Sequence, residues 1–158
     1  MNPSVRSRVY LAIIALLVLV IVAMAYKFIV SGSTAKGEDG RTAILFQSGE
    51  RTLMLGEMRE FVAALQSISD ALARDDRKAV ARAARAVGTA KAGDVPLSML
   101  AKLPIGFKSM AISTHRGFDA IARDADSGAP QKHTLEQLSG TLQNCVACHA
   151  SYQIKAAP

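Results

Sequence analysis

The feature that most constrains this chain is a short run near its C-terminal end, Cys145-Val146-Ala147-Cys148-His149. Two thiols that are two residues apart and are followed at once by an imidazole match the C-x-x-C-H signature for covalent attachment of a c-type haem. Each thiol can form a thioether with one vinyl group of the porphyrin, and the imidazole can then reach the iron. No other cysteine is present in the sequence. The motif predicts one covalent haem c on Cys145 and Cys148, with His149 as the proximal iron ligand.

The same two cysteines could instead form a redox-active pair or a plain disulfide. A redox C-x-x-C of the thioredoxin type occurs near a βαβ pattern. Here the flanking residues have the three-and-four spacing of one helical face. That face holds Leu135, Leu138, Leu142, Cys145 and His149. The helical context favours haem attachment. Because such attachment takes place outside the cytoplasmic membrane, the motif also indicates a periplasmic or equivalent compartment.

An apolar run near the N-terminus extends from Val9 to Val30, with Lys27 as its only charged residue. As a helix this run would be about 33 Å long, against about 30 Å of bilayer hydrocarbon. Arg6 and Arg8 precede it, which favours a cytoplasmic N-terminus. The sequence predicts a single-pass anchor in the inner (cytoplasmic) membrane, with the haem domain in the periplasm.

A cleaved signal peptide is the alternative interpretation of this run. Ala23-Met24-Ala25 resembles an A-x-A processing site, and Ser33-Thr34-Ala35 is a weaker one. The apolar run is longer than the roughly 7–15 residues of an ordinary signal core, which favours an uncleaved anchor. Either interpretation leaves the remaining chain on the periplasmic side.

The rest of the chain predicts an all-α fold, an antiparallel four-helix bundle that follows the N-terminal transmembrane helix. Residues 1–30 form the anchor or signal sequence, 31–40 a polar, glycine-containing linker, and 41–158 the haem-binding bundle. Four segments carry apolar residues at helical spacing. They are 41–73, about 75–92, 105–126 and 131–154. A connector with a short turn at 97–102 separates the second helix from the third.

Local signals refine these helices. Asp75-Asp76 predicts an N-cap for the second helix, and Gly93 followed by Pro96 predicts its end. Gly49 and Gly56 lie inside the first helical pattern, where each costs about 1 kcal/mol relative to alanine. They indicate either a tolerated weakness or the close approach of a flat ring or a second helix.

Histidines and basic residues outside the motif favour surface roles. We expect His115, which lies beside Arg116, at the surface, with iron ligation as the lesser alternative. His133 is also expected to be exposed. Five basic residues are predicted to form a solvated face or, alternatively, a surface for anionic lipid or an acidic redox partner. They are Arg74, Arg77, Lys78, Arg82 and Arg85.

These features resemble the cytochrome c′ family over roughly residues 46–154. The most specific shared feature is a C-x-x-C-H near the end of the last helix of a four-helix bundle. Mitochondrial-type cytochromes c instead carry the motif near the N-terminus, with a methionine ligand far downstream. Only ten residues follow Cys148, so that arrangement is excluded. The resemblance implies covalent haem, frequent homodimers through the first helices, and electron transfer or gas binding.

The resemblance also extends to the first helix. It implies that Arg51 lies near a haem propionate and that Leu55 covers the distal haem face. Met58, seven residues after Arg51, is the first candidate for a distal iron ligand, and Met54 is the second. Sulfur ligation predicts low-spin iron suited to electron transfer, whereas an open apolar face predicts five-coordinate iron that binds NO or CO. Ordinary core packing of both methionines is the alternative.

Two departures from the family stand out. Gln153 occupies the position, four residues after the proximal histidine, where members usually carry arginine or lysine. The N-terminal anchor is the second departure, because most members are soluble periplasmic proteins.

The resulting hypothesis is a membrane-anchored cytochrome that transfers single electrons between a membrane oxidoreductase and a periplasmic redox partner. The alternatives are an NO- or CO-binding module and an accessory subunit of a larger respiratory complex. Nucleic acid is not an expected partner in this compartment. The sequence contains no G-x-S-x-G, P-loop or zinc-helix motif. No enzymatic activity is predicted.

Overall fold

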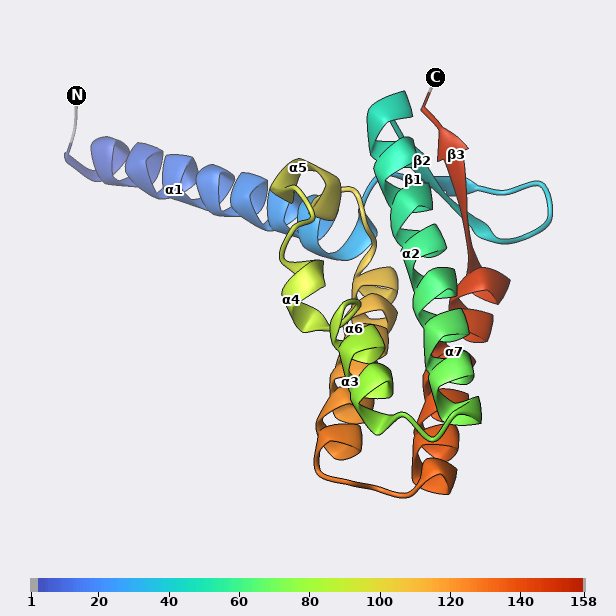
Figure 1. Ribbon diagram of the computed structural model, residues 1–158. Helices are drawn as coiled ribbons and strands as arrows, with labels where there is room; N and C mark the ends of the chain where they lie inside the picture. The colour runs from blue at the N-terminus through green and yellow to red at the C-terminus, as the bar shows by residue number, and fades with distance from the viewer. Residues whose placement is uncertain (1–2, 158) are drawn as a thin grey trace.

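The computed structural model describes residues 3–157, and the side chains of residues 6–157. The described chain is mainly helical, with one small sheet (Figure 1). In chain order its elements are α1 (Pro3–Ala25), η1 (Tyr26–Ser31), β1 (Thr34–Lys36), β2 (Thr42–Phe46), α2 (Ser48–Ala73), α3 (Arg77–Arg85), α4 (Thr89–Ala92), α5 (Leu97–Leu100), α6 (Ile105–Asp126), α7 (Gln131–Ser151) and β3 (Tyr152–Ala156).

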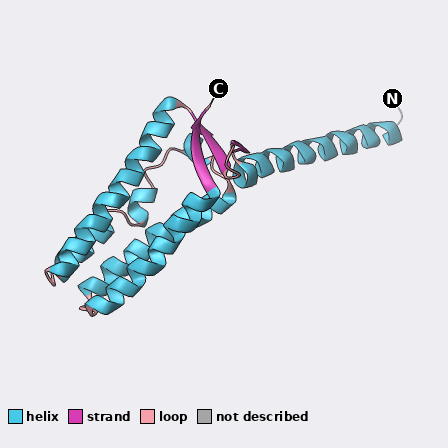
Figure 2. Cartoon of the chain, turned by 90° about the vertical axis from the view of Figure 1, so that its right-hand side faces the viewer, coloured by secondary structure: helices cyan, strands magenta, loops and turns pink. Residues whose placement is uncertain are grey.

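The N-terminal apolar run is one continuous helical rod. α1 continues directly into η1, a π-helical segment, and the rod extends away from the rest of the molecule (Figures 1 and 2). Its stretch Arg6–Ser31 is long and apolar enough to cross a membrane, and none of its most apolar window is buried within the protein. The predicted N-terminal helix of membrane-spanning length and composition is therefore present.

Four helices form the body of the molecule. α2 packs against α3, α3 against α6, and α6 against α7 (Figure 1). Their shared core includes Ile68, Val80, Phe118, Ile121 and Leu138. The aromatic rings of Phe61 and Phe118 stack at 5.6 Å between centroids across this core. The main chains of α2 and α7 approach each other at few points, and the two helices meet through side chains: Leu138 shares the core with α2, and Gln131 Nε2 donates to the Leu72 carbonyl at 3.2 Å.

The small sheet corrects the all-α prediction. Residues 41–46 were expected to begin the first helix, but Thr42–Phe46 is the central strand β2. It pairs antiparallel with β1 and parallel with β3. The segment is rich in β-branched and aromatic residues, which suit a strand. The helix begins only at Ser48, where Gln47 and Glu50 form a capping box.

The other predicted boundaries have mixed outcomes. α6 covers the predicted 105–126, and the Asp76 carboxylate caps α3 by accepting a hydrogen bond from Ala79 N at 2.9 Å. The second helix ends earlier than predicted, because Thr89 N and Oγ1 bond to the Asp119 carboxylate and start the separate α4. The last helix ends at Ser151 rather than Ile154, since the chain turns into β3.

The predicted linker is also more structured than expected. Within residues 31–40, β1 pairs with β2, and Ser33 N donates to the Lys102 carbonyl at 2.8 Å. The N-terminal helix is thus joined to the rest of the molecule by a structured segment.

A second buried cluster lies where the sheet meets α2, α5 and α6. Its buried members are Ile44, Phe46, Met54, Met99, Leu103 and Phe107. This cluster supports the end of α7, because Cys148, Tyr152 and Ile154 pack against it.

Candidate haem-attachment site

The C-x-x-C-H motif occupies the last two turns of α7, directly before β3. Cys145 and Cys148 are half-buried and are not joined to each other. The side chain of His149 is exposed. Both thiols and the imidazole are therefore free to react or to bind. The motif lies inside α7, and the element before α7 is another helix, α6, so no strand leads directly into the motif as in a thioredoxin-like pair.

Burial keeps the two thiols protonated. Burial raises the pKa of the Cys145 thiol above its usual value near 9.0. Burial, with a smaller contribution from neighbouring Cys145, does the same for the pKa of Cys148. Both groups are thus neutral at pH 7, as expected for partly buried cysteines without a nearby cation. A redox-active cysteine would instead have a lowered pKa.

The fold brings the predicted distal residues close to the motif. Met58 and Cys148 pack against the same apolar cluster, although they are 90 positions apart in the chain. Met54 is a full member of that cluster and is only 3% exposed. Met58 is partly buried at its edge. Of the two methionines, Met58 is therefore the less buried and the more accessible to a ligand.

Arg51 and Leu55 share one face of α2 with Met58, because the three residues are spaced by four and three. Arg51 is exposed, and Leu55 is partly exposed. Val62, one further turn along, is 65% exposed. This side of α2 thus presents apolar surface and a guanidinium that the protein itself leaves uncovered.

α7 carries a similar uncovered apolar surface beside the motif. Leu135, Leu142 and Val146 are 53%, 36% and 71% exposed. Leu142 shares the helical face of Cys145 and His149. Exposed leucine and valine side chains along one face are unusual for a helix packed within a domain. They fit the edge of a large apolar group.

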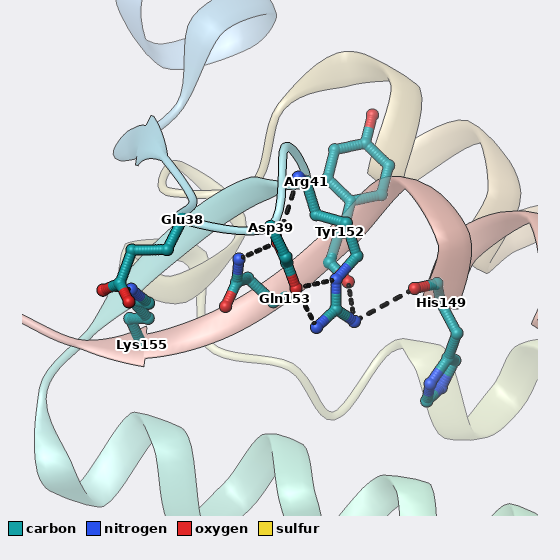
Figure 3. A network of polar contacts seen from close by, with 7 residues as sticks. All are labelled: Glu38, Asp39, Arg41, His149, Tyr152, Gln153 and Lys155. Atoms are coloured by element: carbon teal, nitrogen blue, oxygen red, sulfur yellow. Dashed lines mark hydrogen bonds and ion pairs between the residues drawn. The ribbon is translucent and has the colours of Figure 1, made fainter.

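The carboxyl end of α7 is held by a polar network that joins it to the loop between β1 and β2 (Figure 3). Arg41 Nη1 donates to the His149 carbonyl at 3.1 Å and to the Tyr152 carbonyl at 3.4 Å. The Asp39 carboxylate accepts from Arg41 Nε at 2.8 Å and from Gln153 Nε2 at 2.7 Å. A guanidinium at the end of a helix satisfies carbonyls that have no helical partner. The main chain of His149 is therefore fixed, while its imidazole points away from Arg41 (Figure 3).

Tyr152 is a second residue at the site that sequence analysis did not single out. Its ring packs edge-to-face on Phe107 at 5.5 Å between centroids. Burial, with a smaller effect of Cys148, raises the pKa of its hydroxyl above the usual value near 10.0. No local pattern in the sequence marks Arg41 or Tyr152. Arg41 matters because it bonds to a segment about 110 residues away, and Tyr152 matters because it packs against Phe107 of α6.

The two histidines outside the motif are His115 and His133, and the predicted surface position of His115 is wrong. His115 is not at the surface but 5% exposed, and its Nδ1 is 2.8 Å from the Val87 carbonyl. Its position on the inner face of α6, against Phe61, explains the burial. That carbonyl can only accept, so Nδ1 carries the proton. His133 is partly exposed, and its Nε2 is 3.0 Å from the Asp124 carboxylate.

The basic residues Arg74, Arg77, Lys78, Arg82 and Arg85 are all exposed, as predicted. Arg74 pairs with Asp70, Arg85 with Asp126, and Arg77 lies 3.9 Å from Asp75. These pairs offset much of the positive charge.

Gly49 and Gly56 have no neighbouring segment close to them, so neither marks contact with a second helix of this chain.

The residues present fit a c-type haem: two free thiols at the right spacing, an adjacent free imidazole, and uncovered apolar side chains on α2 and α7. Comparisons with protein-family models, with curated proteins and with solved structures give no match to this chain.

Proposed function

We propose that this protein is a membrane-anchored c-type cytochrome that carries single electrons through a haem attached to Cys145 and Cys148. The observation that carries this proposal is the C-x-x-C-H at the end of α7, with both thiols free and with Cys148 on the same apolar cluster as Met58. The bound haem would supply the one-electron chemistry, with an iron that changes between two oxidation states.

The protein's own residues have separate tasks in this proposal. Cys145 and Cys148 would hold the group, and His149 would bind its iron. Arg41 fixes the main chain that carries His149. Arg51 would meet the acidic edge of the haem, and Leu55 would cover its distal face. The apolar cluster excludes water, which lowers the local dielectric and helps to set the reduction potential.

The family-level part of the proposal is a cytochrome c′-like four-helix bundle made of α2, α3, α6 and α7. The consecutive packing of these helices supports it. The small sheet would then be an addition that ties the end of α7 to the segment after the anchor. The anchor would hold the domain on the periplasmic side of the inner membrane, near a membrane oxidoreductase or within a larger complex.

The experiment is expression of the full chain with a cytochrome c maturation system, followed by denaturing electrophoresis with haem staining and mass measurement. The proposal requires one haem that remains attached after denaturation in the parent chain and is lost in the Cys145→Ala, Cys148→Ala double variant. Colourless protein with free or mutually bonded thiols would refute it.

A gas-binding role is the second candidate, favoured by the burial of Met54 in the core and by the apolar character of Leu55. Visible spectra of the oxidised and reduced protein, with and without CO, separate the two roles. Low-spin spectra that CO leaves unchanged support electron transfer through a six-coordinate iron. High-spin spectra that change with CO support gas binding. Stable copurification with other membrane subunits would indicate the accessory-subunit role.

A further inference from the structure

The junction between the anchor and the domain is rigid. The last carbonyls of a helix have no partners within it, and leaving them bare near a bilayer is costly. Here Lys108 Nζ, from α6, donates to the carbonyls of Phe28 and Ile29 at 3.1 and 3.3 Å. Lys27 Nζ donates to the Gly32 carbonyl at 2.8 Å. A cation from the domain thus completes the end of the membrane helix.

Gly32 closes the other side of this junction. Its φ of +65° belongs to the left-handed region, and an added Cβ would lie 2.3 Å from the Lys102 carbonyl oxygen. The next residue, Ser33, donates its N–H to that same carbonyl. The chain therefore passes from the membrane helix onto the 102–108 segment within two residues of the end of η1.

This junction sets the height of the domain above the bilayer. The apolar run ends at Val30, after about 33 Å of helix, so Val30 lies at the edge of the hydrocarbon. Residues 102–108 contact Phe28, Ile29 and Ser33 directly. They must then lie at the level of the lipid headgroups. In both views α1 leaves from the end of the domain that carries the sheet, and the α2–α3 and α6–α7 connections lie at the opposite end (Figures 1 and 2).

Two large apolar side chains are exposed at this end of the domain. Leu97, at the start of α5, is 82% exposed, and Ile105, at the start of α6, is 48% exposed. They flank Lys102, whose carbonyl binds Ser33. Lys108, three residues after Ile105, donates to the carbonyls at the end of the membrane helix. Apolar side chains beside such a lysine are typical of surfaces that lie in the interfacial region of a bilayer.

We propose that Leu97 and Ile105 form a surface that rests in the headgroup region of the bilayer, held there by the Lys108–η1 and Gly32–Lys102 contacts. The occupant of this surface is lipid, because it continues the surface of the membrane helix itself. This inference depends on the membrane anchoring proposed above but not on the haem. It also places Cys148 and His149 in the membrane-facing half of the domain, since α7 leads into β3 at this end.

The test uses the absence of tryptophan from the chain. A single tryptophan is placed in the full-length protein by Leu97→Trp, Ile105→Trp, Leu17→Trp in the anchor, or Ala73→Trp at the far end of α2. Each variant is reconstituted in phosphatidylcholine–phosphatidylglycerol vesicles with ordinary or brominated acyl chains. Comparing the two kinds of vesicle within one variant makes each variant its own reference, because any quenching by the haem is present in both samples.

The Leu97→Trp and Ile105→Trp variants should lose at least about a third of their fluorescence in brominated vesicles, because interfacial side chains reach the acyl boundary. Leu17→Trp should lose more, and Ala73→Trp should lose none. The proposed lipid-facing surface is refuted if Leu97→Trp and Ile105→Trp give the same intensity ratio as Ala73→Trp. Membrane anchoring still stands in that case if Leu17→Trp is quenched. Absence of quenching in Leu17→Trp overturns both the anchor and the surface.

Discussion

The Arg41 guanidinium donates to the main-chain carbonyl of His149 at 3.1 Å and so joins the start of β2 to the end of α7. A cation is therefore present near His149, the proposed proximal ligand, although this chain has Gln153 where the family that its sequence resembles usually has a basic residue. It acts on the main chain of His149 and not on the imidazole (Figure 3). Gln153 itself orients the Asp39 carboxylate that holds Arg41.

Replacing this guanidinium should loosen the end of α7. Arg41→Gln is expected to lower the free energy of unfolding by about 1 kcal/mol, because two carbonyls lose a charged donor. In haem-loaded protein it should also broaden or shift the visible bands, since His149 is less well fixed. The measurements are urea unfolding by circular dichroism and the visible spectrum. Lys155→Gln, which breaks only the exposed pair with Glu38, is the control and should change neither.

Two glycines that look alike in sequence should respond to alanine in opposite ways. A Cβ at Gly117, on α6, would lie 2.4 Å from Thr141 Oγ1, whereas one at Gly140, on α7, would meet nothing within 4 Å. Gly117→Ala should destabilise by about 1–3 kcal/mol through overpacking. Gly140→Ala should stabilise by about 0.5–1 kcal/mol through helix propensity. Urea midpoints measure both, and a shift of the same sign in both variants would contradict this account of α6–α7 packing.

Replacing each of the two methionines of α2 should affect the free energy of unfolding and the visible spectrum differently. Met54→Ala removes a side chain that is 3% exposed and should cost about 2–4 kcal/mol. Met58→Ala, at the edge of the same cluster, should cost less. If sulfur binds the iron, Met58→Ala should convert a low-spin spectrum to a high-spin one, while Met54→Ala leaves it unchanged. Unchanged spectra in both variants would exclude methionine ligation.

Acid stability should depend on Asp124. Hydrogen bonds from His133 and Gln137, with the charge of Arg123, hold the pKa of Asp124 below its usual value near 3.8. A carboxyl with a lowered folded-state pKa stabilises the fold above the unfolded-state pKa and loses that contribution as pH falls through the folded value. Asp124→Asn should therefore destabilise at pH 5–7 and by much less near pH 2, relative to the parent chain.

Thermal unfolding at a series of pH values tests this expectation. Glu136→Gln is the control, because it breaks only an exposed pair with Lys132 on α7. A stability difference for Asp124→Asn that is constant from pH 2 to pH 7 would show that the carboxylate charge is not responsible.

The local sequence predicted those features that depend on neighbouring residues. Helical spacing predicted α6 with its observed bounds and the helix that carries Cys145 to His149. The Asp76 cap was predicted because capping involves residues three apart. The uncharged run predicted the N-terminal rod, because composition and length alone determine whether a helix can span a bilayer. The C-x-x-C-H chemistry is likewise local, since all three groups lie within five residues.

Tertiary contacts decided the rest. Thr42–Phe46 is a strand only because β1 and β3 supply its hydrogen-bonding partners, and β3 comes about 110 residues later. His115 is buried because α6 turns that face toward Phe61 and Val87, which its charged sequence neighbours concealed. Arg41 reaches His149 through the same sheet. Periodicity reports which face of a segment is apolar, but the partner that satisfies a backbone or a buried nitrogen is chosen by the fold as a whole.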